Sequence, residues 1–441
     1  MPKDETLISI MITNAKQLPL DFVEQDKVTY NSITSKKATF KAGLEVPVHR
    51  WFRLTPSYSP DLVVEMLNTM NCSTGDIVLD PFSGASTTLI ECQINGIKSF
   101  GFEINPLLYF VGKTSLNWNL SSEILKNIFL DIEQNFLKLD SEYTDLDLDN
   151  GKLTVPPIHN PFRWWRRDVI KKALCIKLAI QKSAPSQDIK DFFMLVMAGV
   201  LVPDLTNVTL GKLQLHFINR DKDIIDVWEI FSNHVQTMIG DLEQIPLANG
   251  GASYLYHVDS TSEKLPSPNA LANLVITSPP YPNRYSYVWN TRPHLYFLDL
   301  FDTPRQASDL DKKTIGGTWG TATSMLMKGV ISPENDAIKE VVIPIADEIR
   351  KSDNLMANYL VHYFNMLSRQ ITTMNQVLQP HAKLAYVVGC SELKGVYVET
   401  DVLLAKIIER LGLGFNINTI ERIRKRNSGK NLHESIVYAQ R

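Results

Sequence analysis

The chain has 441 residues, of which 44% are hydrophobic and 21% are charged, and its formal net charge is −3. This composition is that of a globular protein with a large core and room for an inserted domain, and no apolar run reaches the length that crosses a bilayer. It also excludes a polycation, so any contact with nucleic acid must rest on local basic patches.

The spacing of the cysteines and the first residues of the chain indicate in which cellular compartment the protein is expected. The cysteines lie far apart and form no CxxC pair, which argues against a zinc site and a disulfide framework: Cys72, Cys92, Cys175 and Cys390. Residues 1–5 lack the basic and apolar segments of a secretory signal. We therefore expect a protein of the reducing cytoplasm that holds no metal.

Residues 1–45 are weakly periodic and predict an N-terminal arm with one hairpin. A loop over residues 50–58 then leads into a helix. Ser59 has the side chain of an N-cap, and Pro60 suits the first helical position. The apolar residues that follow are spaced for one buried helical face: Leu62, Val63, Met66 and Leu67.

A strand, a turn of small residues and a helix are predicted over residues 76–95. Small residues let the backbone approach a ligand, and the first turn of a helix offers free N–H groups to an anion. A second strand over residues 99–102 ends at Glu103, where a carboxylate is placed to accept both hydroxyls of a ribose. These residues predict the nucleoside-binding half of a doubly wound sheet, with an α/β unit that binds no ligand as the alternative. Neither Gly-rich phosphate loop is present, which argues against a dinucleotide or a nucleoside triphosphate.

Helical periodicity dominates the next part of the chain, and four helices are predicted there: about 121–138, 161–183, 187–202 and 221–245. Residues 139–160 are expected to form a surface loop. This block is too long to be a connection inside a sheet domain, so it predicts an inserted domain.

A basic and aromatic cluster lies in this block: Arg163, Trp164, Trp165, Arg166 and Arg167. One interpretation is contact with phosphates and stacking on bases. The other is an amphipathic helix whose tryptophans are core and whose arginines are solvated. Residues 207–219, which include Lys212, predict a hairpin or loop on the same side.

The α/β pattern resumes with a strand over residues 254–258 that ends at Asp259 and Ser260. Asp259 either accepts from the amino group of an adenine or caps the next turn. A buried strand over residues 274–276 then runs into Thr277, Ser278, Pro279, Pro280 and Tyr281. The prolines stiffen this turn, and the tyrosine places an aromatic plate beside it, an arrangement that can hold a planar ring with an amino group.

The rest of the chain continues in the same style. Helices are expected at about 290–301, 354–378 and 401–411, and a strand at 383–388. Residues 303–335, rich in Gly, Thr and Ser, predict a mobile loop that acts as a lid, contacts DNA or has neither role. The last two strands are separated by a basic run with Arg424, Lys425 and Arg426, which can follow a phosphate backbone or be a solvated loop.

The predicted fold is α/β: a Rossmann-like, doubly wound sheet with an inserted, mainly helical domain. The expected boundaries are an N-terminal arm over 1–45, a first part of the sheet domain over 46–118, the helical insertion over 119–250 and a second part of the sheet domain over 251–441.

Together these residues resemble the amino-group DNA methyltransferases that use S-adenosylmethionine. Residues 80–88 are similar to that family's cofactor motif, with Ser86 in place of the second glycine, and Phe102 to Pro106 to its second motif. Residues 52–57 resemble the motif that flanks the methionine of the cofactor, and residues 277–281 resemble the catalytic motif. The insertion between the two motifs is where the resemblance places target recognition.

The resemblance implies S-adenosylmethionine as cofactor, S-adenosylhomocysteine as product and no metal. It implies the following cofactor-binding residues: Phe52, Thr55, Ser57, Asp80, Pro81, Phe82, Gly84, Ser86, Thr87, Glu103, Ile104, Asn105, Asp259 and Ser260. The implied catalytic residues are Ser278, Pro279, Pro280 and Tyr281. The expected DNA contacts are Arg163, Arg166, Arg167, Lys212, Arg284, Arg424, Lys425 and Arg426.

Serine at position 278 is most associated with the cytosine-N4 members of the family, whereas adenine-N6 members mostly carry Asp or Asn. The resemblance therefore implies N4 methylation of a flipped cytosine in double-stranded DNA, with adenine-N6 as the alternative. An RNA amino-methyltransferase and a catalytically inactive DNA-recognition subunit are further alternatives. The implied setting is the prokaryotic cytoplasm, without a membrane, with DNA of the nucleoid as substrate and a cognate restriction endonuclease as partner.

Overall fold

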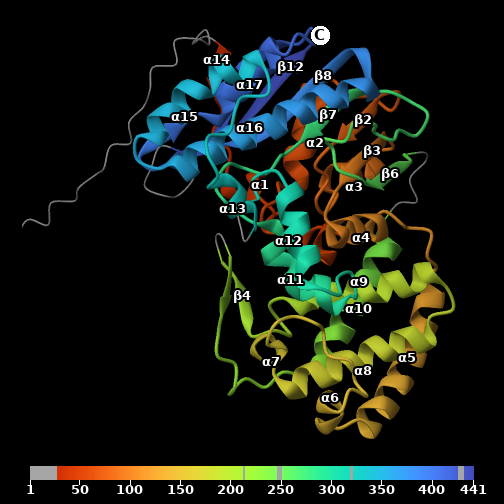
Figure 1. Ribbon diagram of the computed structural model, residues 1–441. Coiled ribbons are helices and arrows are strands. Elements are labelled where there is room, and N and C mark those ends of the chain that lie inside the picture. Colours follow the sequence, from red (N-terminus) through yellow and green to blue (C-terminus); the bar gives the residue numbers. More distant parts are fainter. Residues whose placement is uncertain (1–26, 212–213, 246–250, 318–320, 426–431) are drawn as a thin grey trace, which may run out of the picture.

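The computed structural model describes residues 27–211, 214–245, 251–317, 321–425 and 432–441. Eight strands of this described part form one sheet (Figure 1). In spatial order they are β1 (Val28–Tyr30), β11 (Asn416–Lys425), β12 (His433–Gln440), β8 (Leu378–Gly389), β7 (Ala272–Thr277), β2 (Ile77–Asp80), β3 (Lys98–Glu103) and β6 (Ser253–His257).

The sheet is mixed, with β12 antiparallel to both of its neighbours and the other pairs parallel. The strand order reverses between β2 and β7, because the chain moves outward from β2 to β3 and β6 and then returns to β7 on the other side. Ligands of such sheets bind at this reversal, outside the carboxyl ends of the strands. The doubly wound α/β fold predicted from the sequence is confirmed.

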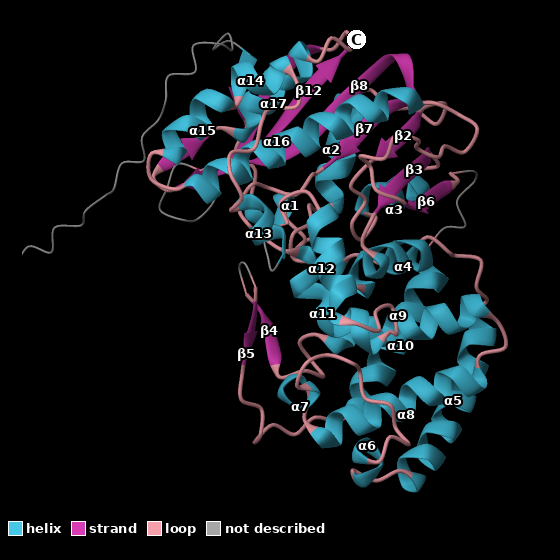
Figure 2. Ribbon diagram, viewed as in Figure 1, coloured by secondary structure: helices cyan, strands magenta, loops and turns pink. Residues whose placement is uncertain are grey.

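Helices pack against the sheet (Figure 2). Alternate residues of the strands belong to two different cores, one on each face of the sheet. Val78, Leu274 and Ile276 pack against the face covered by α2 (Pro60–Thr69). Leu79 and Val275 pack on the opposite face. The helices of that opposite face are α14 (Asp336–Val341), α15 (Ile343–Arg350), α16 (Asn354–Met374) and α17 (Thr400–Arg410).

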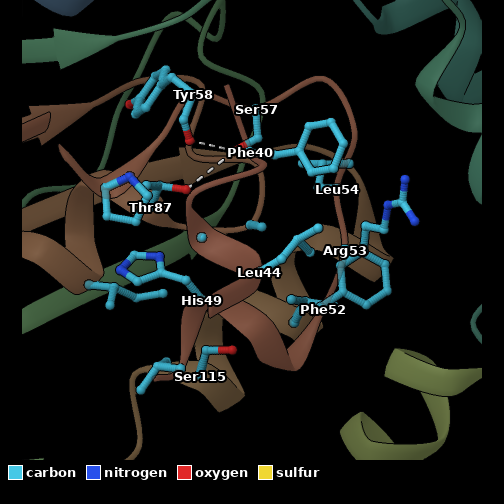
Figure 3. A pocket seen from close by; sticks show the side chains of 16 residues that line it. Phe40, Leu44, His49, Phe52, Arg53, Leu54, Ser57, Tyr58, Thr87 and Ser115 are labelled. Carbon is cyan, nitrogen blue, oxygen red and sulfur yellow. Dashed lines mark hydrogen bonds between the residues drawn. The ribbon is translucent and has the colours of Figure 1, made fainter. Parts of the chain in front are cut away.

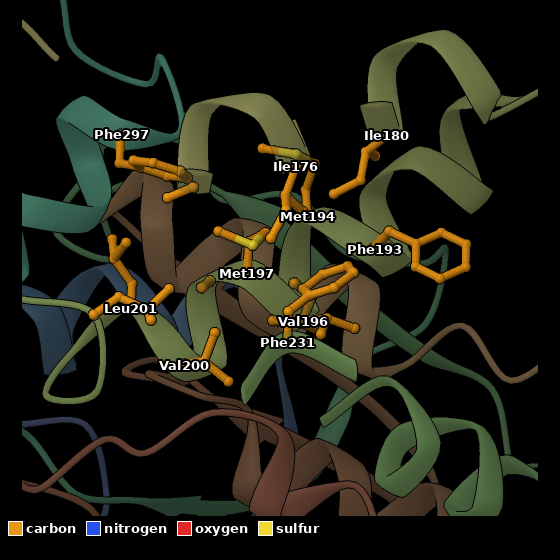
Figure 4. Packing of buried hydrophobic residues seen from close by; sticks show 14 of the residues in the cluster. Ile176, Ile180, Phe193, Met194, Val196, Met197, Val200, Leu201, Phe231 and Phe297 are labelled. Atoms are coloured by element: carbon orange, nitrogen blue, oxygen red, sulfur yellow. The ribbon is translucent and has the colours of Figure 1, made fainter. Parts of the chain in front are cut away.

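A helical lobe is inserted in the chain between β3 and β6, and it lies below the sheet in the view of Figure 1. Its main helices are α5 (Ser122–Glu142), α8 (Arg167–Ser183), α9 (Gln187–Leu201) and α10 (Val227–Gln244). Their apolar faces meet in one core with Phe193, Met197, Phe231 and Phe297 (Figure 4). Shorter elements complete the lobe: α6 (Leu146–Asp149), α7 (Pro161–Trp164) and the hairpin of β4 (Val208–Leu210) and β5 (Leu215–Phe217).

The lobe is tied to the sheet domain through Asp241 of α10. This carboxylate is fully buried and accepts hydrogen bonds from the backbone N–H of Val48 at 3.1 Å, Nε of Arg50 at 3.0 Å and the indole N–H of Trp51 at 2.9 Å. Nε2 of His234 lies 3.0 Å from the carbonyl oxygen of Trp51. The helical lobe therefore binds the start of the predicted loop at 50–58 and the residues just before it.

Several predicted boundaries were wrong. The predicted helix at 161–183 breaks at Arg166, which has extended backbone and precedes α8. The predicted loop at 139–160 contains the end of α5 and all of α6, because Asp145 and the residues after it form a short helical turn. In the described part of the arm, β1 pairs in parallel with β11, so no hairpin forms there, and residues 1–26 lie outside the described residues.

The predicted loop at 303–335 was also wrong, since it holds α12 (Pro304–Lys313) and α13 (Thr321–Leu326) after α11 (Tyr287–Phe297). The Gly-, Thr- and Ser-rich composition of residues 303–335 obscured the start of α12. Thr303 precedes a proline at the first helical position, and its N–H donates to the Gln306 side chain at 2.8 Å. Ala307 and Leu310 are buried, and the Ser286 hydroxyl donates to buried Asp311 at 2.6 Å. This segment thus packs beside the turn at 277–281.

The helix predicted within residues 76–95 is α3 (Thr87–Ile94). The remaining short elements did not stand out in the sequence: α1 (Ser35–Ala38), α4 (Pro106–Ser115), the hairpin of β9 (Ser391–Leu393) and β10 (Val396–Val398), and 3-10 turns at Gly43–Glu45, His49–Trp51 and Asn375–Val377. Within the described ranges, none of the helices combines the length and the apolar character needed to traverse a membrane.

Candidate active site

Asp80, at the carboxyl end of β2, joins three segments of the site. Its buried carboxylate accepts from the Thr277 hydroxyl at 2.6 Å, from the Phe82 N–H at 3.0 Å and from the Tyr58 hydroxyl at 3.1 Å. Burial raises the pKa of Asp80, although each of these hydrogen bonds opposes that rise. Asp80 therefore positions the two predicted motifs and the segment before α2 relative to one another.

The turn after Asp80 uses left-handed backbone at Gly84, with φ of 52°, and at Ser86, with φ of 67°. Ser86 is thus a side-chain-bearing residue in a conformation that suits glycine. It is fully buried, and its hydroxyl has no hydrogen-bond partner among the described residues. The departure from the family motif carries a local energetic cost.

Replacing Ser86 with glycine should raise the free energy of unfolding by about 1 kcal/mol, because the substitution removes left-handed strain and an unpaired buried hydroxyl. Urea unfolding with an unchanged slope would measure this increase. Gly84→Ala is the matched control and should lower stability by about 1 kcal/mol, since it adds a Cβ to left-handed backbone. Equal or lower stability of Ser86→Gly would contradict the account of this turn.

Glu103, at the carboxyl end of β3, is a buried carboxylate held by backbone donors. Its oxygens accept from the Asn105 N–H at 2.7 Å and the Gly84 N–H at 2.8 Å. Burial is the largest influence on its ionisation and raises its pKa from 4.5 to about 7, while the two backbone donors act in the other direction. Glu103 also lines the cavity described next, so it can offer the lone pairs it has left to a ligand.

The cofactor cavity, as we name it, is an open cavity of about 680 Å³ at the strand-order reversal. It is lined by predicted cofactor residues from three strand ends: Pro81, Phe82, Gly84, Glu103, Ile104, Asn105, Asp259 and Ser260. Leu54, Pro56 and the end of α12 with its following residues, including Lys313 and Ile315, also line it. Asp259 faces this cavity and, in addition, accepts from the N–H and hydroxyl of Thr261 at 2.8 and 2.7 Å.

The resemblance implies that Glu103 accepts the ribose hydroxyls of S-adenosylhomocysteine, so the affinity for this ligand should rise with pH up to about pH 7 and then level off. Because the pKa of Glu103 is raised to about 7, the carboxyl is protonated below that pH and loses acceptor capacity for ribose hydroxyls. The affinity should fall by up to about 10-fold per pH unit below the pKa. Calorimetric titrations from pH 5.5 to 8.5 measure this, with Glu103→Gln as a control that binds weakly and without that pH dependence. Parallel profiles of the two proteins would rule out Glu103 as the titrating group.

A second cavity, the base cavity, has about 730 Å³ and adjoins the first. The two cavities share Pro56, Ser278 and Tyr287 as lining residues. The other residues of the base cavity are Thr39, Thr55, Ser57, Tyr58, Tyr281, Asn283, Tyr285, Arg424 and Glu434. Three tyrosines of residues 281–287 thus border a space next to the cofactor cavity.

The turn at 277–281 is held on several sides. The Tyr363 hydroxyl of α16 donates to the carbonyl oxygen of Pro280 at 2.8 Å. The Tyr281 hydroxyl donates to Glu434 of β12 at 2.6 Å, and Glu434 also pairs with Nε of Arg424. Pro279 is buried, whereas Ser278 and Pro280 are half-buried and line the cofactor cavity. This rigidity suits a binding wall.

Three of the remaining predicted cofactor residues line a third cavity of about 430 Å³ (Figure 3). Phe52, Ser57 and Thr87 line it, and the Ser57 hydroxyl lies 3.4 Å from the Thr87 hydroxyl. It shares Leu54 with the cofactor cavity. Thr55 lines the base cavity instead, and Asp80 and Ser86 are buried behind the cavity walls.

The structure places the predicted DNA contacts in two settings. Within the helical lobe, the Arg163 guanidinium lies over the Phe217 ring, Arg167 pairs with Asp149, and Arg166 donates to carbonyl groups. Trp164 and Trp165 are buried in the lobe core, which agrees with the second interpretation of this cluster, core tryptophans, and not with base stacking. Near the base cavity, Arg284 and Lys425 are exposed and Arg424 lines the wall. Lys212 and Arg426 lie outside the described residues.

Sequence reasoning missed several residues of this site. Tyr58 and Thr277 bind Asp80, and Tyr287 borders both the cofactor and base cavities. Tyr58 and Tyr287 could have been predicted as site residues, because each lies close in sequence to a predicted motif. Glu434 carried no such signal, since only the pairing of β12 with β11 and β8 brings it to the base cavity.

The fold and site define a class of protein: an α/β protein with an open cavity at its strand-order reversal and a second, tyrosine-lined cavity beside it. Comparisons agree with this class. A family model described as DNA methylase, N6_N4_Mtase, matches residues 24–109.

Relatives match most of the chain at low identity. The Type II methyltransferase M.MvaI from Kocuria varians is 21% identical over 380 residues, 82% of this chain and 81% of that protein. M.BsoBI from Geobacillus stearothermophilus is 22% identical over 447 residues, covering 93% and 86%. M.AvaI from Nostoc sp. is 21% identical over 434 residues, covering 89% and 84%.

Among solved structures, the rRNA methyltransferase aviRa from Streptomyces viridochromogenes matches with a TM-score of 0.28 and 8% identity, covering 90% of this chain and 92% of that one. That likeness is too low to inform the fold. The family model and the relatives show that the chain is similar to the amino-group DNA methylases of the N6/N4 class.

Proposed function

We propose that this protein transfers a methyl group from S-adenosylmethionine to the exocyclic N4 of a flipped cytosine in double-stranded DNA, as the modification enzyme of a restriction–modification system. The observation that carries the proposal is the position of Ser278. This residue lines both the cofactor cavity and the base cavity, so its hydroxyl stands where a methyl donor and an acceptor base would meet.

The residues of the cofactor cavity fit the proposed cofactor. Glu103 would accept the ribose hydroxyls, with its carboxylate already oriented by the N–H groups of Gly84 and Asn105. Asp259 would face the adenine, and Phe82 and Ile104 would supply apolar walls. Phe52, Ser57 and the start of α3 would border the methionine end, where helix N–H groups favour a carboxylate. When bound, S-adenosylmethionine supplies an electrophilic methyl group.

The base cavity accounts for the handling of the acceptor. A duplex hides the amino group, so the cytosine must leave the stack and enter a cavity. Tyr281 would stack on the flipped ring, with its own ring fixed through Glu434. The Ser278 hydroxyl and the Pro279 carbonyl oxygen would accept hydrogen bonds from the two N–H groups of the amino group.

These contacts favour a more tetrahedral nitrogen whose lone pair is free for methyl transfer. No strong base is required beforehand, because the proton becomes acidic only once the nitrogen is alkylated. Positioning and preorganised dipoles therefore supply most of the catalysis.

Target recognition is assigned in this proposal to the helical insertion over 119–250, with the sheet domain divided into 46–118 and 251–441. The relatives named above are Type II methyltransferases, which supports a cognate restriction endonuclease that acts on the same site. Asp241 would connect recognition to catalysis, because it binds the segment that precedes Leu54 and Pro56 of the cofactor cavity.

Transfer of tritiated methyl groups from labelled S-adenosylmethionine tests the reaction class. The protein should label duplex DNA and leave RNA of the same sequence unlabelled, and Tyr281→Ala should label neither. Label in RNA would favour an RNA methyltransferase. Cofactor binding without any transfer would favour an inactive recognition subunit.

A further inference from the structure

The wall of the base cavity carries an ion pair, and one of its residues, Arg424, has no role in the proposed mechanism. Glu434 pairs with Nε of Arg424, and the two residues face each other across paired strands β11 and β12. Both line the base cavity, with side chains that are 20% exposed for Arg424 and 8% for Glu434. The pair is therefore a feature of the cavity wall rather than of the outer surface.

The guanidinium of Arg424 is only partly occupied by the chain. Its Nε donates to Glu434, whereas its two terminal nitrogens have no hydrogen-bond partner among the described residues. A guanidinium stays charged and presents its N–H groups in a rigid, planar fork. Because Glu434 holds one edge, the rest of the fork is available to an acceptor inside the cavity.

Glu434 also connects this fork to the aromatic wall. The same carboxylate accepts from the Tyr281 hydroxyl at 2.6 Å. One buried side chain thus orients both the cation and the ring that border the cavity. A substitution at Glu434 would release both, so Arg424 is the residue at which recognition can be tested separately.

We infer that Arg424 is a specificity-determining residue that reads the flipped base through N3 and O2 of cytosine, with Glu434 as its positioning residue. This inference rests on the proposed function. Cytosine presents two neighbouring acceptors beside its amino group, which match two N–H groups of a guanidinium fork. Adenine presents one acceptor, N1, and then a C–H group, so the same fork would leave an N–H unpaired. The arrangement selects cytosine over adenine.

The test uses a duplex that contains the methylation site mapped in cells, with either cytosine or 3-deazacytosine at the target position. The analogue keeps the amino group and O2 but replaces N3 with C–H. Single-turnover methyl transfer by the wild-type protein should be about 10- to 100-fold slower on the analogue, the effect of one lost charged hydrogen bond. Arg424→Met should lose a similar factor on cytosine, and the analogue should slow it by less than about threefold further.

Two further variants make the result interpretable. Arg369→Met removes a comparable Arg–Glu pair, with Glu334, on exposed parts of the chain outside the base cavity, and it should behave as the wild type on both duplexes. Arg424→Lys keeps the charge but loses the fork, and it should resemble Arg424→Met in its response to the analogue. Retained binding of S-adenosylhomocysteine shows that each variant is folded.

The inference is overturned if a folded Arg424→Met methylates cytosine at the wild-type rate, or if the analogue slows both proteins by the same factor. Should Arg424→Met fail to bind S-adenosylhomocysteine, Arg424→Lys decides by the same two criteria. The failure of the proposed function looks different, because the wild-type protein would then place its methyl group on adenine.

Discussion

Replacing Tyr281 with alanine should lower the rate of methyl transfer to DNA by about 10³-fold while the affinity for S-adenosylhomocysteine stays within about twofold. Removal of the ring loses base stacking, worth about 1–3 kcal/mol, and the misplaced base loses about 10²-fold more. Tyr281 lines the base cavity and not the cofactor cavity, which is why binding of the cofactor product should be spared. Single-turnover kinetics and calorimetry measure the two quantities.

Tyr281→Phe is the matched control for that variant. It keeps the aromatic face and removes the hydroxyl that donates to Glu434. A loss of about 10-fold or less is expected, since one hydrogen bond and some ring order are lost. A phenylalanine variant as slow as the alanine variant would show that the hydroxyl, and not the ring, carries the effect.

Replacing Asp80 with alanine should lower the free energy of unfolding by about 3 kcal/mol and weaken the binding of S-adenosylhomocysteine at least about 10-fold. The donors of Thr277, Phe82 and Tyr58 would each lose their hydrogen bond to this carboxylate. The turn that carries Gly84 and the strand end that carries Ser278 would then lose their common anchor. Urea unfolding and calorimetric titration measure the two effects.

Thr277→Val separates the two roles of Asp80. It removes one of the three hydrogen bonds while the turn at 81–86 keeps its own bond through Phe82. Methyl transfer should slow while binding of S-adenosylhomocysteine is nearly unchanged. If Asp80→Ala leaves both stability and binding at wild-type values, the carboxylate is not the anchor described above.

Local patterns were sufficient to predict most of the sheet domain. Ser59 caps α2 through a 3.1 Å bond from the Leu62 N–H, as its place before Pro60 indicates. The apolar strands β2 and β7 lie within a residue or two of their predicted limits because each is a short buried run between breakers. The strand end at Glu103 is equally local. Helix caps and short buried strands depend on residues that are adjacent in the sequence, so local patterns predict them.

The features that the sequence did not predict depend on contacts between residues far apart in the sequence, or on the N-cap of α12, which was not identified. Arg166, predicted as a DNA contact, also binds the carbonyl groups of Arg220 and Asp223, which lie more than 50 residues away and which no local pattern indicates. Glu434 reaches Tyr281 across 153 residues through strand pairing alone. The helix α12 was hidden by a Gly- and Thr-rich surrounding, although its capping residues were visible.

Sequencing of DNA from cells that express this protein, by a method that distinguishes N4-methylcytosine from N6-methyladenine, tests whether the protein methylates cytosine. We expect N4-methylcytosine at one recurrent sequence, absent from cells that express Tyr281→Ala. N6-methyladenine at a recurrent sequence, or no methylation in cells that contain the folded protein, would contradict this expectation.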